Sequence, residues 1–329
     1  MRFAETWVPA RLIATRDLAP DIREFLLQPE TITVAPYAVG SHINVGVTIG
    51  GLPETRSYSL VGEADQKGFR IAVRRAEDSR GGSRYMWQLT AGARLELTLP
   101  VSLFQIDWAR PHYCLVAGGI GITPLVGAAD VLARRNAGFT LHYAVRSRRD
   151  AAYLDELKAL LGDRLIVHAG DEGRRLDLDT VFARLPADTM ALFCGPMRML
   201  DAARRAWAAC GRATTDLRYE TFGSSGRLPS EAFRVRVKDA GVEFEIPQDR
   251  SMLDVLNDAG CEVMSDCRRG ECGVCALDVV DVEGEIDHRD VFFSDHQKQE
   301  NRKICACVSR ARGVITVDTL RRPDAVALR

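Results

Sequence analysis

Short apolar segments that alternate with polar residues fill the first third of the chain. Five of them are separated by turns that contain Gly or Pro: residues 8–14, 22–28, 42–48, 69–73 and 95–99. A period of two places every second side chain on the same face of a strand. Evenly spaced short strands of this kind are typical of a small antiparallel barrel. We therefore predict a β-barrel domain over residues 1–108.

From residue 109 the pattern changes to strands that alternate with helices. Strands are expected at 113–117, 139–144, 164–168 and 190–194. One helix is expected to have Thr123 as its N-cap and Pro124 in its first turn, and to end at Gly138. Another is expected over 151–161, closed by Gly162. This alternation predicts an α/β domain with a parallel sheet over residues 109–223.

The last third follows a segment rich in Gly and Ser, residues 224–230, which we interpret as a linker. Beyond it, the pattern predicts strands at 233–238, 242–246 and 314–317 and a short helix at 251–258. Strands around one helix, with a cysteine loop at the edge, indicate a β-grasp ferredoxin domain over residues 231–329.

Three cysteines in that domain have the spacing C-x4-C-x2-C: Cys267, Cys272 and Cys275. With a distant fourth cysteine, this spacing is typical of plant-type [2Fe–2S] sites. Gly270 and Gly273 are expected where the loop needs a positive φ or a close approach of the backbone. A structural zinc site is the alternative, but zinc sites usually have two C-x2-C pairs, and this loop has one.

Two residues compete for the place of the fourth ligand. Twenty-nine residues separate Cys305 from Cys275, as in plant ferredoxins, and thirty-one separate Cys307 from Cys275. Both side chains would point to the same side of an extended strand. The spacing leaves the choice open.

Two features of the first domain are candidates for binding a flavin phosphate. The tetrapeptide 56–59, Arg-Ser-Tyr-Ser, combines a cation, an aromatic ring and two hydroxyls at the end of a strand. Arg74 and Arg80 flank Gly81, Gly82 and Ser83, which precede or begin a helix expected over 83–89. A helix N-terminus that follows glycines favours anion binding.

In the second domain, candidate nucleotide-binding residues follow the strands. Ligands bind parallel sheets at the carboxyl ends of the strands. Residues at these ends are Gly118, Gly119, Gly121, Thr123, Pro124, Arg146, Asp171, Cys194, Gly195 and Pro196. The glycine loop lacks the G-x-G-x-x-G spacing, and a buried cysteine is also common without any function. Asp171 favours NADH over NADPH, although Arg174 and Arg175 weaken this argument.

Charge and cysteine content narrow the class of protein. The net charge of −1 gives no reason to expect binding to nucleic acid or to a membrane surface. Residues 228–329 hold 20 acidic and 15 basic residues, and the remainder holds 25 and 29. The apolar stretch 114–129 is too short and too interrupted to span a bilayer. Because residues 1–15 lack the apolar segment of a signal peptide, we expect the nine cysteines in a reducing cytoplasm.

Across nearly its whole length the chain resembles the phthalate dioxygenase reductase and vanillate O-demethylase reductase family. The matching motifs are Arg56-Ser57-Tyr58-Ser59-Leu60, Gly81-Gly82-Ser83, Gly118-Gly119-Ile120-Gly121-Ile122-Thr123-Pro124, Cys194-Gly195-Pro196, Glu220-Thr221-Phe222-Gly223, the cysteine loop, His288-Arg289-Asp290 and Cys307-Val308-Ser309-Arg310-Ala311. Their order, flavin then nicotinamide then ferredoxin, is the order of the family.

The resemblance implies three cofactors and their binding residues. FMN would be bound by Arg56, Ser57, Tyr58, Ser59, Ala72, Val73, Arg74, Gly81, Gly82, Ser83, Thr123 and Phe222. NADH would lie over the loop 118–124, with Ser59, Cys194 and Glu220 as the catalytic residues. The [2Fe–2S] cluster would be held by Cys267, Cys272, Cys275 and Cys307, with Cys305 in reserve.

The resemblance also implies a function. The family takes a hydride from NADH onto FMN and passes single electrons through the cluster to a Rieske-type oxygenase, its protein partner. An NAD(P)H-dependent reductase that serves a P450 or another acceptor is the second hypothesis. A non-enzymatic iron–sulfur redox sensor is the third, and anaerobic addition of NADH separates it from the other two, because a sensor would bleach neither flavin nor cluster.

Overall fold

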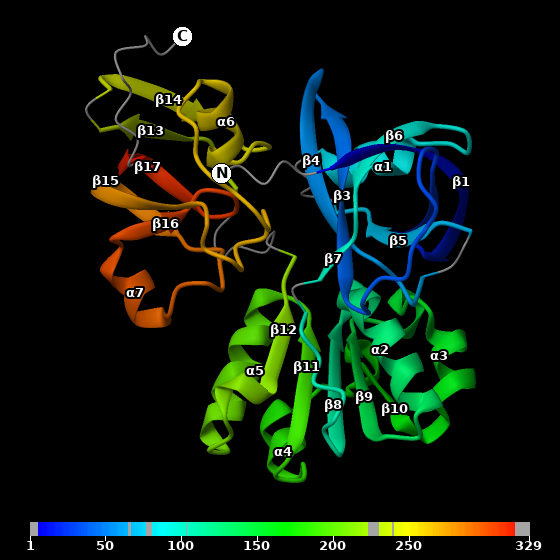
Figure 1. Cartoon of the computed structure of the whole chain (residues 1–329). Coiled ribbons are helices and arrows are strands. Elements are labelled where there is room, and N and C mark those ends of the chain that lie inside the picture. The colour runs from blue at the N-terminus through cyan, green and yellow to red at the C-terminus, as the bar shows by residue number, and fades with distance from the viewer. Residues whose placement is uncertain are drawn as a thin grey trace. The chain divides into compact units, whose positions relative to one another are not determined.

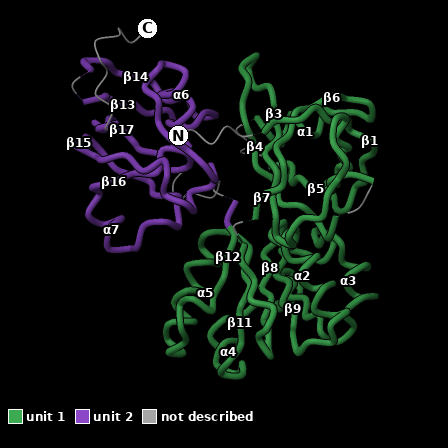
Figure 2. Tube along the Cα trace, viewed as in Figure 1, with its two compact units in different colours: residues 1–220 green, residues 221–329 purple. Residues whose placement is uncertain are grey.

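The computed structural model describes residues 6–64, 67–76, 81–102, 104–222, 230–238 and 240–319. Arg80 and all of the expected linker except Ser230 lie outside these residues. The chain divides into two compact units, Met1–Glu220 and Thr221–Arg329 (Figure 2). The first unit holds two sheets and the second holds one.

The first sheet of unit 1 is antiparallel and has the strand order β4-β3-β6-β1-β2-β5, with β7 paired to β3. Its elements are β1 (Trp7–Ala19), β2 (Ile22–Pro29), β3 (Ser41–Ile49), β4 (Leu52–Ser59), β5 (Phe69–Arg74), α1 (Gly82–Gln88), β6 (Arg94–Thr98) and β7 (Val101–Ser102). A bridge between Leu60 and Ile71 joins the two ends of the strand order. This confirms the predicted barrel.

The barrel core comes from the apolar positions of the alternating pattern. Leu12, Phe25, Val45, Ile71 and Leu97 are fully buried in one cluster. Each of them occupies a strand, so the period of two in the sequence becomes an inward-facing row of side chains.

The second sheet of unit 1 is parallel throughout, with the order β10-β9-β8-β11-β12. Its elements are β8 (His112–Gly118), η1 (Gly119–Ile122), α2 (Thr123–Arg134), β9 (Gly138–Val145), η2 (Arg148–Asp150), α3 (Leu154–Leu161), η3 (Gly162–Arg164), β10 (Leu165–Ala169), η4 (Gly170–Glu172), α4 (Leu178–Ala183), β11 (Thr189–Cys194), α5 (Met197–Ala209), η5 (Thr214–Asp216) and β12 (Leu217–Glu220). Figure 1 shows α2 and α3 on one side of this sheet and α4 and α5 on the other. The predicted α/β sheet is confirmed.

In the α/β part of unit 1, three helix boundaries differ from the prediction. Ile122 is the N-cap of α2, and Thr123 is its first helical residue, because the Thr123 hydroxyl donates to the Ile120 carbonyl (3.1 Å) within the preceding 3-10 turn. The helix ends before Asn136, which has a φ of +51°, and Gly138 already begins β9. The third helix starts at Leu154, because Tyr153 has a φ of +59°.

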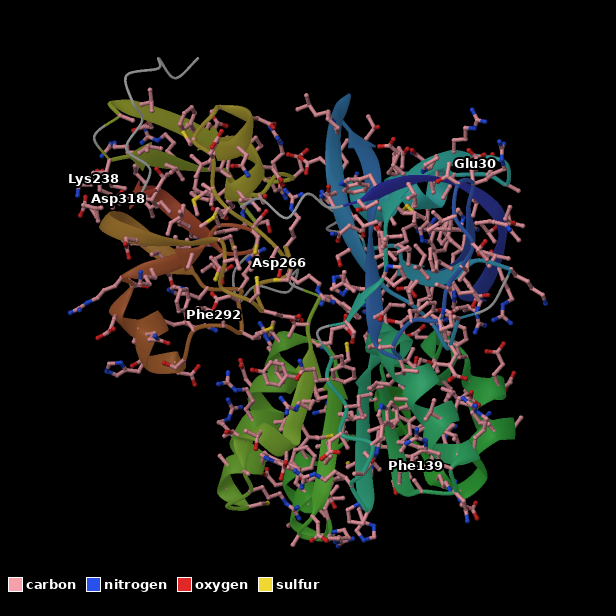
Figure 3. The ribbon with its side chains drawn as sticks, viewed as in Figure 1. Glu30, Phe139, Lys238, Asp266, Phe292 and Asp318 are labelled. Carbon is pink, nitrogen blue, oxygen red and sulfur yellow. The ribbon has the colours of Figure 1, made fainter. Side chains whose placement is uncertain are left out.

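Unit 2 is a mixed sheet with the order β14-β13-β17-β15-β16. Its elements are β13 (Phe233–Val237), β14 (Val242–Ile246), α6 (Met252–Asp258), β15 (Ala276–Asp287), α7 (Asp295–Glu300), β16 (Lys303–Cys305) and β17 (Arg310–Asp318). Strands β13 and β17 are parallel neighbours. Lys238, just after β13, and Asp318, at the end of β17, are labelled in Figure 3, and Lys238 Nζ lies 3.4 Å from Asp318 Oδ2. The predicted ferredoxin layout is confirmed.

A buried arginine stabilises the start of β17. The Arg310 guanidinium donates to four backbone carbonyls, those of Arg250, Glu231 and Pro247 at 2.8–2.9 Å and that of Ile246 at 3.5 Å. It also lies over the ring of Phe233, 5.0 Å from the centroid. Burial, and next the charge of Arg289, lower the pKa of Arg310 to about 10, so this residue stays charged at neutral pH.

Candidate functional site

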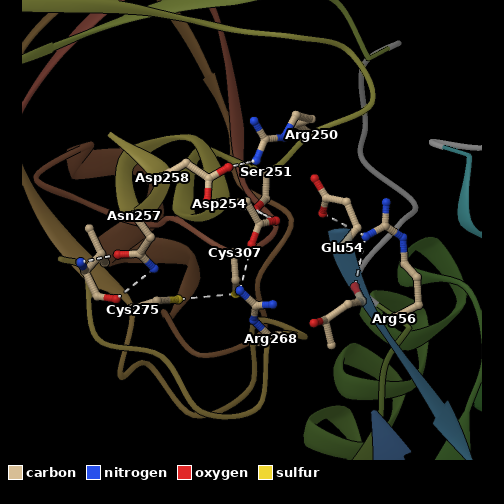
Figure 4. Close-up of polar contacts among 12 residues, drawn as sticks. Glu54, Arg56, Arg250, Ser251, Asp254, Asn257, Asp258, Arg268, Cys275 and Cys307 are labelled. Atoms are coloured by element: carbon tan, nitrogen blue, oxygen red, sulfur yellow. Dashed lines mark hydrogen bonds and ion pairs between the residues drawn. The ribbon is translucent and has the colours of Figure 1, made fainter. Parts of the chain in front are cut away.

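The cysteines of unit 2 lie on two segments that the fold brings together. Cys267, Cys272 and Cys275 lie on the loop between α6 and β15, and Cys305 and Cys307 lie at and just after the end of β16. Ala276 pairs with Cys305 across the two strands, which brings Cys275 close to the second segment. The Cys275 and Cys307 sulfurs are 3.2 Å apart (Figure 4).

The thiols of the loop form a second close pair. The Cys272 thiol lowers the pKa of Cys267 to about 6 by hydrogen bonding, helped by the backbone N–H groups of Arg269 and Glu271, which each lie 3.4 Å from the Cys267 sulfur. Hydrogen bonds from Cys305 and Cys307 lower the pKa of Cys275 to about 3. These effects favour the thiolate, the form that binds iron, at Cys267 and Cys275, while the same hydrogen bonds raise the pKa of their partners Cys272 and Cys307.

This arrangement fits a two-iron cluster. Such a cluster takes four cysteine thiolates, and backbone N–H groups directed at the sulfurs tune it. Among the described residues, no group of three or more His, Cys, Asp or Glu side chains is arranged to hold a metal ion. The thiols are instead grouped around Cys267 and around Cys275, as two iron atoms would require. Gly270 and Gly273 have φ values of +77° and +74°, as the sequence predicted.

The barrel carries the candidate flavin residues at the end of β4. The Ser57 hydroxyl is buried and has no hydrogen-bond partner within the described part of the chain. The Tyr58 ring, at the next position of β4, is partly buried, and burial raises the pKa of the Tyr58 phenol. A buried hydroxyl without a partner is costly, and a ligand atom would satisfy it. This geometry fits a flavin at the end of β4.

The glycines at the start of α1 let an arginine come close to the backbone. A Cβ at Gly82 would lie 2.7 Å from the Arg56 side chain, and one at Gly81 would lie 2.5 Å from Ile49. Arg56 is thereby held over the start of α1, where the phosphate is expected. Arg56 pairs with Glu54 (3.3 Å) and Arg74 with Asp21 (2.7 Å), while Ala72 and Val73 are buried in β5. The structure thus brings Arg56, but not the Arg74 guanidinium, to the start of α1.

The nucleotide loop packs against the end of β11. A Cβ at Gly121 would lie 2.1 Å from the Cys194 carbonyl oxygen, and one at Gly118 would lie 2.7 Å from Pro196. Cys194 itself pairs with Ala117 on β8 and with Glu220 on β12. Residues 118–124 and 194–196, distant in sequence, therefore meet at the carboxyl ends of neighbouring parallel strands.

Arg146 and Asp171 lie at the ends of the next two strands. The Asp171 backbone N–H donates to the Arg146 carbonyl (3.0 Å), which joins the two segments. Glu172 Oε1 pairs with Arg148 Nε (2.5 Å), and Glu172 Oε2 lies 3.8 Å from Arg174 Nε. Arg174, which argued for NADPH in the sequence, therefore has a neighbouring carboxylate.

A buried hydrogen bond joins the barrel to the parallel sheet. The Ser59 hydroxyl at the end of β4 donates to Glu220 Oε1 at the end of β12 (2.8 Å), and both residues are buried. Because Cys194 neighbours Glu220 across the sheet, the three predicted catalytic residues come together. Phe222, predicted to complete the flavin pocket, lies two residues beyond β12 at the start of unit 2.

Sequence reasoning missed one polar contact of the cysteine loop. Glu271 Oε1 accepts hydrogen bonds from the backbone N–H (2.7 Å) and the hydroxyl (3.2 Å) of Thr221. This fixes the first residue of unit 2 to the loop. The only signal in the sequence was an acidic residue between two cysteines, in a loop expected to carry negatively charged sulfur.

The fold and these sites define an oxidoreductase with NAD-binding and iron–sulfur parts. The family model described as "2Fe-2S iron-sulfur cluster binding domain" matches residues 235–312, and that described as "Oxidoreductase NAD-binding domain" matches residues 115–205.

Individual relatives match over almost the whole chain. The heme-dependent oxidative N-demethylase beta subunit of Ectopseudomonas mendocina (strain ymp) is 36% identical, over 94% of this chain and 97% of its own. Phthalate dioxygenase reductase of Burkholderia cepacia is 33% identical, over 92% and 94%. The solved structure of a phthalate dioxygenase reductase, described as modular for electron transfer from pyridine nucleotides to [2Fe–2S], superposes with a TM-score of 0.79 at 31% identity, covering 95% of this chain and 98% of that one.

The chain belongs to the phthalate dioxygenase reductase family, whose members include reductase subunits of oxygenase systems. It is an NADH-dependent oxidoreductase with FMN and a [2Fe–2S] cluster as its cofactors. None of the described helices is both long and apolar enough to cross a membrane.

Proposed function

We propose that this protein is the NADH-dependent reductase of a Rieske-type oxygenase. The observation that carries the proposal is the grouping of thiols in unit 2, with Cys275 and Cys307 3.2 Å apart and two N–H groups directed at Cys267. Flavins accept two electrons together and release them singly, whereas a [2Fe–2S] cluster accepts one at a time. A chain with both cofactors can therefore convert a hydride donor into a source of single electrons.

The residues of unit 1 would position the reactants. Arg56 and the backbone at Gly81–Ser83 would neutralise the flavin phosphate, with Ser57 hydrogen-bonded to the flavin and Tyr58 against its ring. The loop 118–124 would bind the pyrophosphate of NADH, and glycine at 118 and 121 lets this loop pack against residues 194–196. Ser59 and Glu220, joined by their hydrogen bond, would form a fixed pair of polar groups beside Cys194, where the nicotinamide is expected.

The residues of unit 2 would hold the cluster and its charge. We assign Cys267, Cys272, Cys275 and Cys307 as ligands. The N–H groups of Arg269 and Glu271 would stabilise the sulfur charge. We propose three domains: the barrel domain at 1–108, the α/β domain at 109–223 and the ferredoxin domain at 231–329. The linker 224–230 joins the second domain to the third. We propose a reducing, cytoplasmic compartment, in which cysteines that bind iron stay reduced.

Purified protein, NADH and a purified Rieske-type oxygenase, mixed without oxygen, test the proposal. We expect the Rieske signal to appear in the electron paramagnetic resonance spectrum of the oxygenase. The Cys272→Ser variant should still oxidise NADH at the flavin but should not reduce the oxygenase. If the wild-type protein binds its cofactors and no Rieske oxygenase is reduced, the Rieske assignment is wrong.

A heme-dependent oxygenase is the second candidate partner. The relative at 36% identity is a subunit of an enzyme described as heme-dependent. The same anaerobic mixture distinguishes the two, because a ferrous heme forms a carbon monoxide complex with its own visible spectrum, and a Rieske cluster does not.

A further inference from the structure

The segment His288-Arg289-Asp290 lies between the two cysteine-bearing segments of unit 2. Asp290 is completely buried, with 0% of its surface exposed. Neither the metal ligands nor the nucleotide site explains a buried acid at this position. A buried carboxylate is costly unless hydrogen bonds or charges compensate it, so its surroundings indicate what it does.

Asp290 contacts the cysteine loop at Gly270. A Cβ at Gly270 would lie 2.9 Å from the Asp290 Cα and 2.6 Å from Val308, which directly follows Cys307. The Val291 N–H donates to the Gly270 carbonyl (2.9 Å). Only glycine therefore fits between Asp290 and the segment that carries the fourth cysteine.

The Asp290 carboxylate is also hydrogen-bonded to the segment that carries the fourth cysteine, Cys307. Oδ1 accepts a hydrogen bond from the Ser309 hydroxyl (3.1 Å), and the Ser309 oxygen in turn accepts from the Arg289 N–H (3.1 Å). Oδ2 accepts from the Phe293 N–H (2.9 Å). Because Ser309 is two residues from Cys307, these bonds fix the Cys307 segment against the loop of the other three cysteines.

The ionised form of Asp290 is stabilised both by hydrogen bonds and by a nearby positive charge. Burial alone would raise the pKa of Asp290, but His288, the Phe293 N–H and the charge of Lys298 lower it below its ordinary value. Lys298 Nζ lies 4.0 Å from Oδ2, and His288 Nδ1 lies 3.6 Å from Oδ1. The neighbouring Arg289 pairs with Asp287 (2.7 Å).

We propose that Asp290 is a positioning residue that joins the two cysteine segments and whose negative charge lowers the reduction potential of the cluster, with Lys298 partly offsetting it. A fixed negative charge in a medium of low dielectric opposes the addition of an electron nearby. A positive charge that neutralises it has the opposite effect. The inference rests on the proposed ligands, because it requires the cluster to lie between these segments.

Two substitutions that remove charges of opposite sign test the inference. Asp290→Asn keeps the shape of the side chain and removes the charge, so the midpoint potential of the cluster should shift to a more positive value. Lys298→Gln removes a positive charge 4.0 Å from Asp290 Oδ2, so the potential should shift to a more negative value. Both are measured by redox titration monitored by electron paramagnetic resonance, on protein whose iron and sulfide content matches the wild type. Lys303→Gln is the matched control, since Lys303 pairs with Asp278 at an exposed site (2.5 Å), and it should leave the potential unchanged.

The outcomes separate this inference from the proposed function. A wild-type protein without a [2Fe–2S] signal would reject the ligand assignment itself. A normal wild-type signal, with Lys298→Gln unchanged in potential or shifted to a more positive value, would overturn the role of Asp290. If Asp290→Asn fails to bind the cluster, while Lys298→Gln binds it and shifts as expected, both parts of the proposal are supported.

Discussion

At the scale of single residues, the function depends on side chains brought together from distant positions. Ser59 and Glu220 are separated by 161 positions and share a buried hydrogen bond. Cys275 and Cys307 are separated by 32 positions and their sulfurs are in contact. Sequence motifs named these residues, but only the fold shows that they are neighbours.

The choice between Cys305 and Cys307 is a first prediction at this scale. Cys307→Ser should lose most of the cluster, whereas Cys305→Ser should retain it, since we assign Cys307 as the ligand. Iron and sulfide analysis and the visible spectrum of each purified variant provide the measurement.

The reverse result would make Cys305 the ligand. Because Cys305 also lies beside Cys275, a reduced but measurable cluster content in Cys307→Ser would indicate that Cys305 replaces the missing thiolate. The double variant should then contain no cluster.

A second residue-scale prediction concerns the nucleotide. Asp171→Asn removes the carboxylate expected to bind the ribose hydroxyls and to repel a 2′-phosphate. The ratio of kcat/KM for NADH to that for NADPH should fall about tenfold, which corresponds to about 1.4 kcal/mol. Asp179→Asn, on the exposed side of α4, is the control. An unchanged ratio would remove Asp171 from the site.

At the scale of elements, the strands could be predicted well from the sequence, and the helix ends less well. Alternating apolar positions located β2 and β13, which each have one face more buried than the other, whereas a continuous apolar run located β8, which is buried on both faces. The start of α3 was missed because a tertiary contact determines it. The Tyr153 hydroxyl donates to Glu24 on β2 (2.9 Å), and this holds Tyr153 in a left-handed conformation that no local pattern indicates.

β15 also lacked a usable pattern. Over residues 276–287 it combines acidic residues with valines, and several of its positions are exposed. Its register with β17 shifts between Val279 and Asp281. Such an irregularity interrupts the period of two on which strand prediction depends.

The close approach of the nucleotide loop to β11 gives a prediction for an element. Gly121→Ala would place a Cβ 2.1 Å from the Cys194 carbonyl oxygen, so the backbone must move. We expect the free energy of unfolding to fall by about 1–3 kcal/mol and the KM for NADH to rise. Gly46→Ala, whose Cβ would have its nearest neighbour at 3.6 Å, should be close to neutral in denaturant unfolding. Equal effects of the two substitutions would contradict the packing argument.

The neighbouring strands β9 and β10 give a prediction of pH dependence. His142 Nδ1 and His168 Nε2 are 3.0 Å apart, and burial, followed by the nearby His168, lowers the pKa of His142 to about 4. The unfolded chain therefore binds a proton at higher pH than the native chain does. Stability should be full above pH 6.5 and should be lost as the pH falls toward 4, by up to about 3 kcal/mol from this residue.

Urea unfolding of wild type and His142→Gln between pH 7 and pH 4 measures this effect. The variant should lose less stability than the wild type over the interval. Parallel pH profiles for the two proteins would show that His142 has an ordinary pKa.

At the scale of the whole molecule, the order of parts was predictable and the detailed site was not. The cysteine spacing and the strand–helix alternation identified two cofactor-binding parts, because each pattern has a local physical cause. The surroundings of Asp290 could not be predicted, because they combine residues from α7, the segment just before β17 and the cysteine loop. Spacing within one segment carries no information about such a convergence.

The central claim is that one chain converts the hydride of NADH into single electrons at a [2Fe–2S] cluster. Stopped-flow mixing of cofactor-loaded protein with NADH, without oxygen, tests it most directly. We expect the flavin absorbance to bleach first and the cluster to follow, and rapid freezing should then yield the electron paramagnetic resonance signal of a reduced [2Fe–2S] centre. A cluster that stays oxidised while the flavin is fully reduced would contradict the account.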